Sequence, residues 1–176
     1  MALQPADCVI GGTLPGALQA VLKETLRLYP VAPFVVRKVE KKLVFQEGDG
    51  PRLEIPPGVL CCIWIYGLHR HPDVWENADA FCPERWLPQQ EPSSPEAASC
   101  GRVGKAMLDS WMPFARGPRG CIGQTLAWRM LRVVLAHVYT NVLTESSEEL
   151  SCEGKGMQAG FTVLPRDGVW VRMTKR

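Results

Sequence analysis

The chain has 176 residues, of which 46% are hydrophobic and 22% are charged, and its formal net charge is +2. This composition excludes a disordered or fibrous protein, and the length suffices for one domain with its own core. The longest nearly apolar run is about half of the roughly 20 residues that cross a bilayer, and the amino terminus has no basic leader, so we expect neither a membrane anchor nor a signal peptide.

The first predicted element is a helix over residues 13–29, whose apolar side chains recur at helical spacing. Thr13 is the expected N-cap, and Pro30 prevents the helix from continuing. Residues 34–45 are rich in β-branched side chains and predict a strand. In residues 53–66, Pro57 and Gly58 suit the centre of a type II turn between short strands, which predicts a small antiparallel sheet.

Residues 67–87 mix turn signals with aromatic side chains and predict a packed irregular segment. Residues 89–109 are rich in proline, serine, alanine and glycine, and we expect an exposed, flexible insertion without chemistry. A second helix is predicted over residues 122–143, and the final stretch predicts two short strands around a Pro-Arg-Asp-Gly turn. The apolar stripe of this second helix comprises Leu126, Met130, Val133 and Val134, with His137 beside them.

Glu24 and Arg27 lie three residues apart and share one side of the first helix. Such pairs are usually surface ion pairs, but leucines flank Arg27 on both sides. A charge pair in apolar surroundings needs further hydrogen-bonding partners to offset its desolvation. Arg85, within the sequence FCPERW, is the candidate third member.

Residues 114–123, FARGPRGCIG, place one cysteine in a glycine-rich loop immediately before the second helix. The helix dipole and free backbone N–H groups there stabilise a thiolate. Gly120 and Gly123 allow backbone or a flat cofactor to approach, and Arg119 can meet an anionic group. Taken alone, such a cysteine is more often a plain structural thiol than a ligand.

The remaining cysteines and charges carry weaker signals. Seven cysteines are an odd number, scattered and without a CxxC pair, so we expect reduced thiols, and His69 with His71 lacks zinc-ligand spacing. Residues 110–144 contain four arginines and no acidic residue. Both a solvated helix face and a docking surface for an acidic partner fit this pattern, whereas no stacking motif supports nucleic-acid binding.

Taken in order, Glu24-x-x-Arg27, FCPERW and FARGPRGCIG resemble the C-terminal part of the cytochrome P450 family, in which a cysteine thiolate holds haem. The loop fits the family form F-x-x-G-x-x-x-C-x-G. The resemblance implies a partial cytochrome P450 domain over residues 1–176, with residues 89–109 as an insertion. Its expected fold is mixed α and β, mainly α, with two main helices, a small antiparallel sheet and a cysteine-ligand loop.

The resemblance also implies site residues. Cys121 is the expected axial ligand of haem b iron, Phe114 and Gly123 lie beside it, and Arg119 and Arg37 bind the haem propionates. Glu24, Arg27 and Arg85 form the expected structural triad. The expected substrate-contacting residues are Val31, Ala32, Pro33, Phe34 and Val35, with a looser contact near Gly160 and Phe161.

The activity implied by the resemblance is monooxygenation, the insertion of one oxygen atom of O2 into a small apolar organic substrate. A flavoprotein reductase or iron-sulfur protein would dock near Arg116, Arg119, Arg129 and Arg132. A eukaryotic parent enzyme would be associated with the endoplasmic reticulum membrane. The chain lacks the family's A-G-x-x-T oxygen-activation segment, which leaves two alternatives: a truncated, inactive fragment that cannot hold haem, or a peroxide isomerase or dehydratase that needs no reductase.

Overall fold

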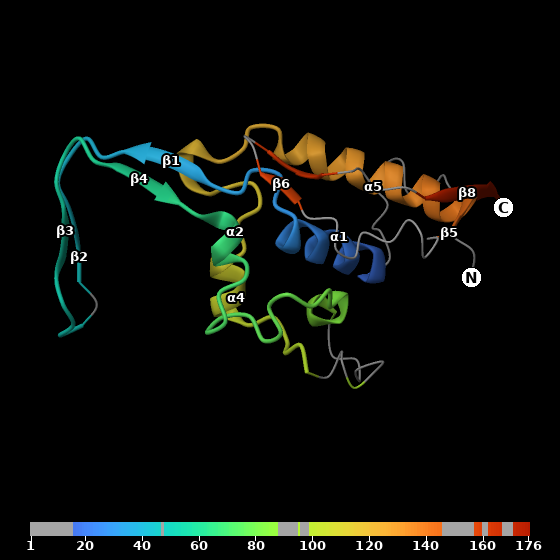
Figure 1. Cartoon of the computed structure of the whole chain (residues 1–176), viewed down its shortest axis with the longest axis horizontal. Helices are drawn as coiled ribbons and strands as arrows, with labels where there is room; N and C mark the ends of the chain where they lie inside the picture. Colours follow the sequence, from blue (N-terminus) through green and yellow to red (C-terminus); the bar gives the residue numbers. More distant parts are fainter. Residues whose placement is uncertain are drawn as a thin grey trace.

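The computed structural model describes residues 16–46, 48–87, 95, 99–145, 157–159, 162–166 and 171–176. Within these residues the fold is mixed α and β, as predicted, and its longest helices lie near its centre (Figure 1). The α-helices are α1 (Gly16–Leu28), α2 (Ile65–Leu68), α4 (Lys105–Ser110) and α5 (Gln124–Asn141), and the 3-10 helices are η2 (Pro83–Trp86) and η3 (Gly117–Arg119). No helix of this described part is long and apolar enough to cross a membrane.

The strands form antiparallel pairs rather than one small sheet. The pairs are β1 (Val35–Lys38) with β4 (Leu60–Ile63), β2 (Leu43–Phe45) with β3 (Leu53–Ile55), β5 (Val142–Glu145) with β8 (Arg172–Lys175), and β6 (Met157–Ala159) with β7 (Val163–Pro165). The two strands predicted around Pro-Arg-Asp-Gly are confirmed as β7 and β8, but they do not pair with each other, because each pairs with an earlier strand.

The predicted strand over residues 34–45 is divided in two at Val39. This residue is buried, its N–H donates to the Val59 carbonyl at 2.8 Å, and its carbonyl accepts from Gly58 N–H at 2.7 Å. Gly58 has a φ of 91°, as the third position of a type II turn requires. The chain thus leaves the β1–β4 pair and continues into the β2–β3 hairpin, which projects from the body of the molecule (Figure 1).

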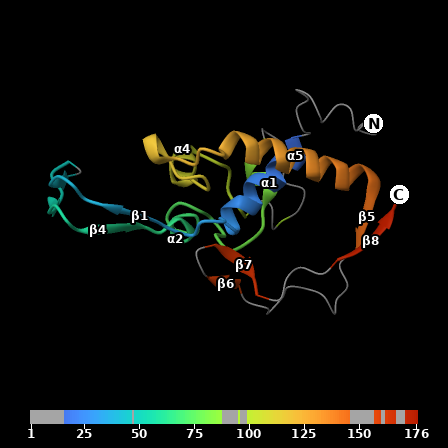
Figure 2. The same cartoon turned by 90° about the horizontal axis from the view of Figure 1, so that it is seen from above.

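Helices α1 and α5 pack against each other at the centre of the molecule (Figure 2). The buried residues of this contact are Leu22 and Ala136, with Leu18, Trp128, Leu131 and Leu135 packed around them. The stripe predicted on α5 lies on a different face, where Leu126 and Val134 are 62% and 60% exposed. The predicted helix is confirmed. The face that it buries is not the predicted stripe but the one that carries Trp128 and Ala136.

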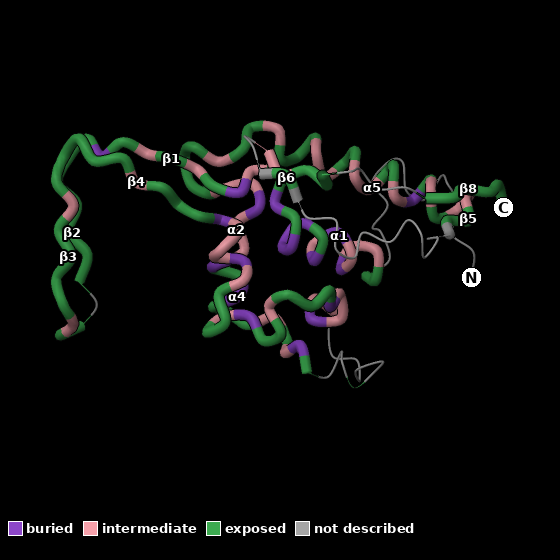
Figure 3. The backbone as a smooth tube through the Cα atoms, viewed as in Figure 1, coloured by how far each residue is buried: buried purple, intermediate pink, exposed green. Residues whose placement is uncertain are grey.

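The first helix ends as predicted. Its bounds in the described chain reach Leu28, and the Tyr29 N–H still donates to the Thr25 carbonyl at 2.8 Å before Pro30. The predicted N-cap Thr13 lies outside the described residues. Buried positions gather along α1 and along the irregular segment after α2 (Figure 3).

Residues 99–109 form the described end of the expected insertion. They include the start of α4, and Cys100 and Met107 within them are 1% and 7% exposed. Cys100 is joined by a disulfide to Cys82, with Cα atoms 6.3 Å apart, inside the usual range for a disulfide. The expectation of reduced cysteines is therefore wrong for this pair, whereas Cys61, Cys62 and Cys121 are free thiols in the described chain.

Candidate functional site

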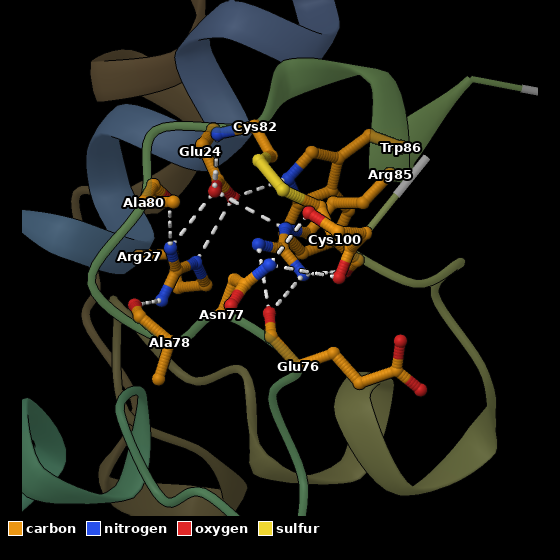
Figure 4. The surroundings of a disulfide bond; sticks show 11 residues. Glu24, Arg27, Glu76, Asn77, Ala78, Ala80, Cys82, Arg85, Trp86 and Cys100 are labelled. Atoms are coloured by element: carbon orange, nitrogen blue, oxygen red, sulfur yellow. Dashed lines mark hydrogen bonds and ion pairs between the residues drawn. A yellow bond between two sulfur atoms is a disulfide. The ribbon is translucent and has the colours of Figure 1, made fainter. Parts of the chain in front are cut away.

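Glu24, Arg27 and Arg85 meet in the interior, where their side chains are fully buried (Figure 4). Arg27 contacts the Glu24 carboxylate through two atoms, Nη2 at 2.8 Å from Oε1 and Nε at 2.9 Å from Oε2. Arg85 Nε donates to Oε1 at 3.1 Å from 61 residues away in the sequence. The structure thus brings together the three residues that the sequence grouped, which we call the triad.

Two further donors complete the surroundings of the Glu24 carboxylate. The Cys82 backbone N–H donates to Oε1 at 3.0 Å, and Trp86 Nε1 donates to Oε2 at 2.9 Å. Burial by itself raises the pKa of Glu24, but hydrogen bonds from Arg27 and Cys82 and the charges of both triad arginines outweigh it. The pKa of Glu24 therefore lies below its ordinary value, and the carboxylate stays charged inside the protein.

The remaining N–H groups of the two arginines donate to backbone carbonyls. Arg27 reaches the carbonyls of His69 and Ala80, each at 2.9 Å. Arg85 reaches the carbonyl of Glu76 at 3.3 Å and also that of Cys100 (Figure 4). The triad consequently holds the irregular segment after α2 and the end of the insertion, and sequence patterns carry no signal for such backbone partners.

His69 is a buried residue that the sequence analysis named only for its unsuitable zinc spacing. Its side chain is 0% exposed, Nδ1 lies 3.0 Å from the Arg27 carbonyl, and Nε2 accepts from the Met112 N–H at 2.9 Å. Burial, opposed by the Arg27 carbonyl and reinforced by the charges of Arg27 and Arg70, lowers the pKa of His69 to about 4. The imidazole is therefore neutral at pH 7.

The cysteine loop, residues 114–123, presents Cys121 at the surface immediately before α5. The Cys121 N–H donates to the Phe114 carbonyl at 2.9 Å, and the Gln124 N–H donates to the Cys121 carbonyl at 3.3 Å. Gly117 has a φ of 74°, in the left-handed region that favours glycine. A Cβ on Gly120 would lie 3.2 Å from the Gly117 carbonyl oxygen, so a side chain at this position would require the loop backbone to shift slightly.

Arg37 and Arg119 come together at one edge of the cysteine loop. Arg37, on β1, donates from Nη2 to the Arg119 carbonyl at 3.4 Å across 82 residues of sequence. Arg119 is exposed and Arg37 is half-buried. The Arg37 guanidinium therefore lies against the backbone of the cysteine loop at Arg119, two residues before the thiol. Both arginines carry a cation that suits a carboxylate.

Phe114 packs behind the loop against Trp128 of α5, with ring centroids 5.9 Å apart. A row of tryptophans continues from there to the triad, since Trp86 donates to Glu24. The centroid distances are 6.4 Å for Trp111–Trp128, 5.2 Å for Trp86–Trp111 and 6.0 Å for Trp75–Trp86. Aromatic packing thus links the cysteine loop to the buried charges.

The predicted substrate-contacting segment follows α1 and exposes apolar side chains, with Val31 and Phe34 57% and 43% exposed. Pro33 is buried and its carbonyl accepts from Tyr66 N–H at 2.9 Å, while Ala32 and Val35 are half-buried. The Val163 N–H donates to the Val31 carbonyl at 3.0 Å, which places β7 beside this segment. Gly160 and Phe161 lie outside the described residues.

The arginines of the predicted docking face differ in their surroundings. Arg116, Arg119 and Arg129 are exposed, whereas Arg132 lies over the Trp128 ring, 5.7 Å from its centroid. Arg116 lies 3.8 Å from Asp109 of α4, which partly neutralises its charge. Arg119 and Arg129 therefore present the least compensated positive charge of this group among the described contacts.

Comparisons with known proteins agree with this arrangement. The family model for cytochrome P450 matches residues 16–165. Cytochrome P450 4g1 of Drosophila melanogaster is 30% identical over 97% of this chain and 28% of its own length. Cytochrome P450 4F2 of Homo sapiens is 36% identical over 68% of this chain and 20% of its own. Taurochenodeoxycholic 6 alpha-hydroxylase of Sus scrofa is 36% identical over 65% of this chain and 19% of its own.

The chain thus spans between about a fifth and somewhat more than a quarter of the length of these curated relatives. The matched region contains the triad, the segment after α1 and the cysteine loop, which are the parts that the structure brings together. With a family model covering most of its length, the chain belongs to the cytochrome P450 family.

Proposed function

We propose that this chain forms the haem-thiolate part of a monooxygenase that inserts one oxygen atom of O2 into a small apolar organic substrate. The observation that carries the proposal is the exposed Cys121 thiol in a loop whose edge holds Arg37 and Arg119 together. The hydroxylase name of the pig relative supports oxygen insertion as the reaction class.

The residues present fit haem b. A thiol that is exposed, free and held by backbone hydrogen bonds at a helix start is a suitable axial ligand for iron. Cys121 is exposed, and Gly123 lies beside its sulfur without crowding it, since even a Cβ at this position would be 3.9 Å from Sγ. Arg37, held against the Arg119 carbonyl, and Arg119 itself supply the two cations for the two propionates in this proposal.

Each residue of the site has a distinct task in this proposal. Cys121 would hold the haem iron, and haem held by a thiolate would supply O2 activation with a preference for O–O cleavage. Phe114, packed on Trp128, covers one side of the loop. The exposed apolar side chains of Val31 and Phe34 contact the substrate and exclude water from it.

Electrons would arrive from a partner with an acidic surface, a flavoprotein reductase or an iron-sulfur protein. Helix α5 carries Arg129 and Arg132 and no acidic residue, and Arg119 precedes it. Reversing the exposed Arg116 and Arg129 to glutamate, neither of which is assigned to haem here, should slow reduction at low salt, and an unchanged rate would contradict this docking face. For a eukaryotic parent enzyme, we propose association with the endoplasmic reticulum membrane.

The decisive experiment is expression of the full chain with haem, followed by reduction and addition of CO. The expected result is the red-shifted CO absorption that marks a thiolate ligand, and its loss in Cys121→Ala. Cys62→Ala is the matched control, because Cys62 is also an exposed free thiol. Absence of haem from the wild-type chain would favour the alternative, an inactive fragment, and an unchanged spectrum in Cys121→Ala would overturn the ligand assignment.

A further inference from the structure

The His69 imidazole contacts two segments that are far apart in the sequence. It follows α2, it is 0% exposed, and both of its ring nitrogens have partners. One partner is the carbonyl of Arg27, a member of the triad, and the other is the N–H of Met112, just ahead of the cysteine loop. The side chain therefore lies between the buried charges and the loop.

The partners determine which nitrogen carries the hydrogen. A backbone N–H can only donate, so the Met112 amide requires an unprotonated Nε2 at its distance of 2.9 Å. The hydrogen is then on Nδ1, which donates to the Arg27 carbonyl at 3.0 Å. That carbonyl belongs to the last turn of α1, where carbonyls lack partners within the helix. Arg27 in turn donates from Nη1 to the His69 carbonyl at 2.9 Å, so the pair is held reciprocally.

A short series of backbone hydrogen bonds leads from Met112 to the thiol. The Met112 carbonyl accepts from Ala115 N–H at 2.9 Å, which closes a turn around Phe114. The Phe114 carbonyl then accepts from Cys121 N–H at 2.9 Å. Met112 is therefore connected to the cysteine through the backbone hydrogen bonds of this turn.

We propose that His69 is a positioning residue that couples the triad to the cysteine loop and so fixes the direction of the Cys121 thiol; this rests on the proposed function of that loop. His69 acts through Met112 and touches neither the thiol nor the apolar segment after α1 in the described contacts. A neutral imidazole suits this role because one ring nitrogen, Nδ1, donates while the other, Nε2, accepts.

Two substitutions by amide side chains test the two hydrogen bonds of His69 separately. In His69→Asn the amide nitrogen takes the place of Nδ1 and can still donate to the Arg27 carbonyl, but the side chain is too short for Met112. In His69→Gln the amide oxygen takes the place of Nε2 and can still accept from the Met112 N–H. His71→Asn and His71→Gln are the matched controls, because His71 is 52% exposed and lies two residues further along.

The first readout is hydrogen exchange of the Met112 amide in the full chain without haem. His69→Asn should speed its exchange about tenfold, as expected for one lost hydrogen bond, whereas His69→Gln and both His71 variants should stay within about threefold of wild type. The second readout, after haem loading, is the fraction of the CO-bound haem that shows the red-shifted absorption of a thiolate ligand. It should fall in His69→Asn and be retained in His69→Gln.

Equal protection of the Met112 amide in the wild type and in His69→Asn would overturn the proposal, as would equal effects of the asparagine and glutamine variants on the loop. The first readout does not use haem, so it decides the role of His69 even where the chain binds none. Conversely, a wild type with a full thiolate signal that His69→Asn leaves intact would refute this coupling and leave the proposed function standing.

Discussion

Glu24 shows at the scale of one residue how a buried charge is retained. Its carboxylate accepts hydrogen bonds from both triad arginines, from Cys82 and from Trp86. An unpaired charge in this position would cost several kcal/mol, whereas the full set of donors offsets much of the desolvation. The triad is therefore a junction between elements, and it depends on all of its members.

Removing the Glu24 charge should destabilise the protein strongly. Glu24→Gln leaves two buried arginines without their counter-ion and should lower the free energy of unfolding by about 3–5 kcal/mol. Denaturant unfolding of the full chain measures the change. Glu54→Gln is the control, since Glu54 forms surface ion pairs with Lys42 and Arg52 and should contribute less than about 1 kcal/mol. Similar losses in both variants would contradict the role assigned to burial.

The neutral His69 makes stability depend on pH. Its pKa is lowered from 6.5 to about 4, so between these values the unfolded chain binds more protons than the folded one. The stabilisation is complete above about pH 6.5 and is lost as the pH falls toward 4, by about 3 kcal/mol in total. Unfolding free energies between pH 7 and 4.5 should therefore fall less steeply in His69→Gln than in the wild type. Parallel profiles would show that His69 does not titrate in this way.

Sequence reasoning at this scale reached the charged members of the site but not their surroundings. The spacing of Glu24 and Arg27 and the leucines beside Arg27 predicted a buried pair in need of a third partner. The carbonyls that complete the network belong to residues such as Ala80, whose type carries no signal. His69 was missed because its role depends on a backbone amide 43 residues away.

At the scale of elements, α5 shows that a helical period does not determine which face is buried. The α5 residue buried against α1 is Ala136, which is 3% exposed, and Trp128, Leu131 and Leu135 pack around it. The aliphatic stripe containing Leu126 and Val134 lies on another face and is largely exposed in this chain. Large aromatic area and the small Ala136, which permits close approach, outweigh the more regular aliphatic pattern.

The two faces of α5 should differ in their sensitivity to truncation. Leu22→Ala removes a side chain that is 7% exposed in the α1–α5 contact and should cost about 2–5 kcal/mol. Leu126→Ala, at 62% exposure, should change stability by less than about 0.5 kcal/mol. Denaturant unfolding of both variants provides the comparison, and a larger loss at Leu126 would indicate that this face is covered.

Element ends were easier to predict than element partners. Pro30 ends α1 where expected, and Gly58 adopts the positive φ that its turn requires. The prediction of one small sheet was wrong, because β3 and β4, on either side of this turn, pair with different strands, β2 and β1. A local sequence pattern predicts that a strand forms. The strand with which it pairs depends on the path that the chain takes through the fold, which the local pattern does not contain.

At the scale of the whole molecule, the Cys82–Cys100 disulfide joins the triad segment to the start of the α4 region. Its two residues also serve the triad directly, since Cys82 donates to Glu24 and Cys100 accepts from Arg85. Scattered cysteines give no sign of such a pairing, because the spacing of 18 residues crosses a stretch without regular sequence signals.

Reduction of this disulfide should destabilise the full chain by about 3 kcal/mol, the value expected for a loop of this size. Denaturant unfolding with and without dithiothreitol measures the effect. A Cys82→Ala/Cys100→Ala double variant should be insensitive to the reductant, whereas Cys61→Ala/Cys62→Ala should respond like the wild type. A response that persists in the first variant would assign the effect to other thiols.

The same disulfide provides a second covalent connection between residues 82 and 100, besides the backbone. Together with the hydrogen bond from Val103 N–H to the Arg85 carbonyl at 3.1 Å, it ties the two ends of residues 86–99 to each other. The residues on either side of this stretch are thus linked directly, by one covalent bond and one backbone hydrogen bond. A change in the number of residues between Cys82 and Cys100 should therefore leave the cysteine loop in place, because none of the described hydrogen bonds of that loop involves residues 86–99.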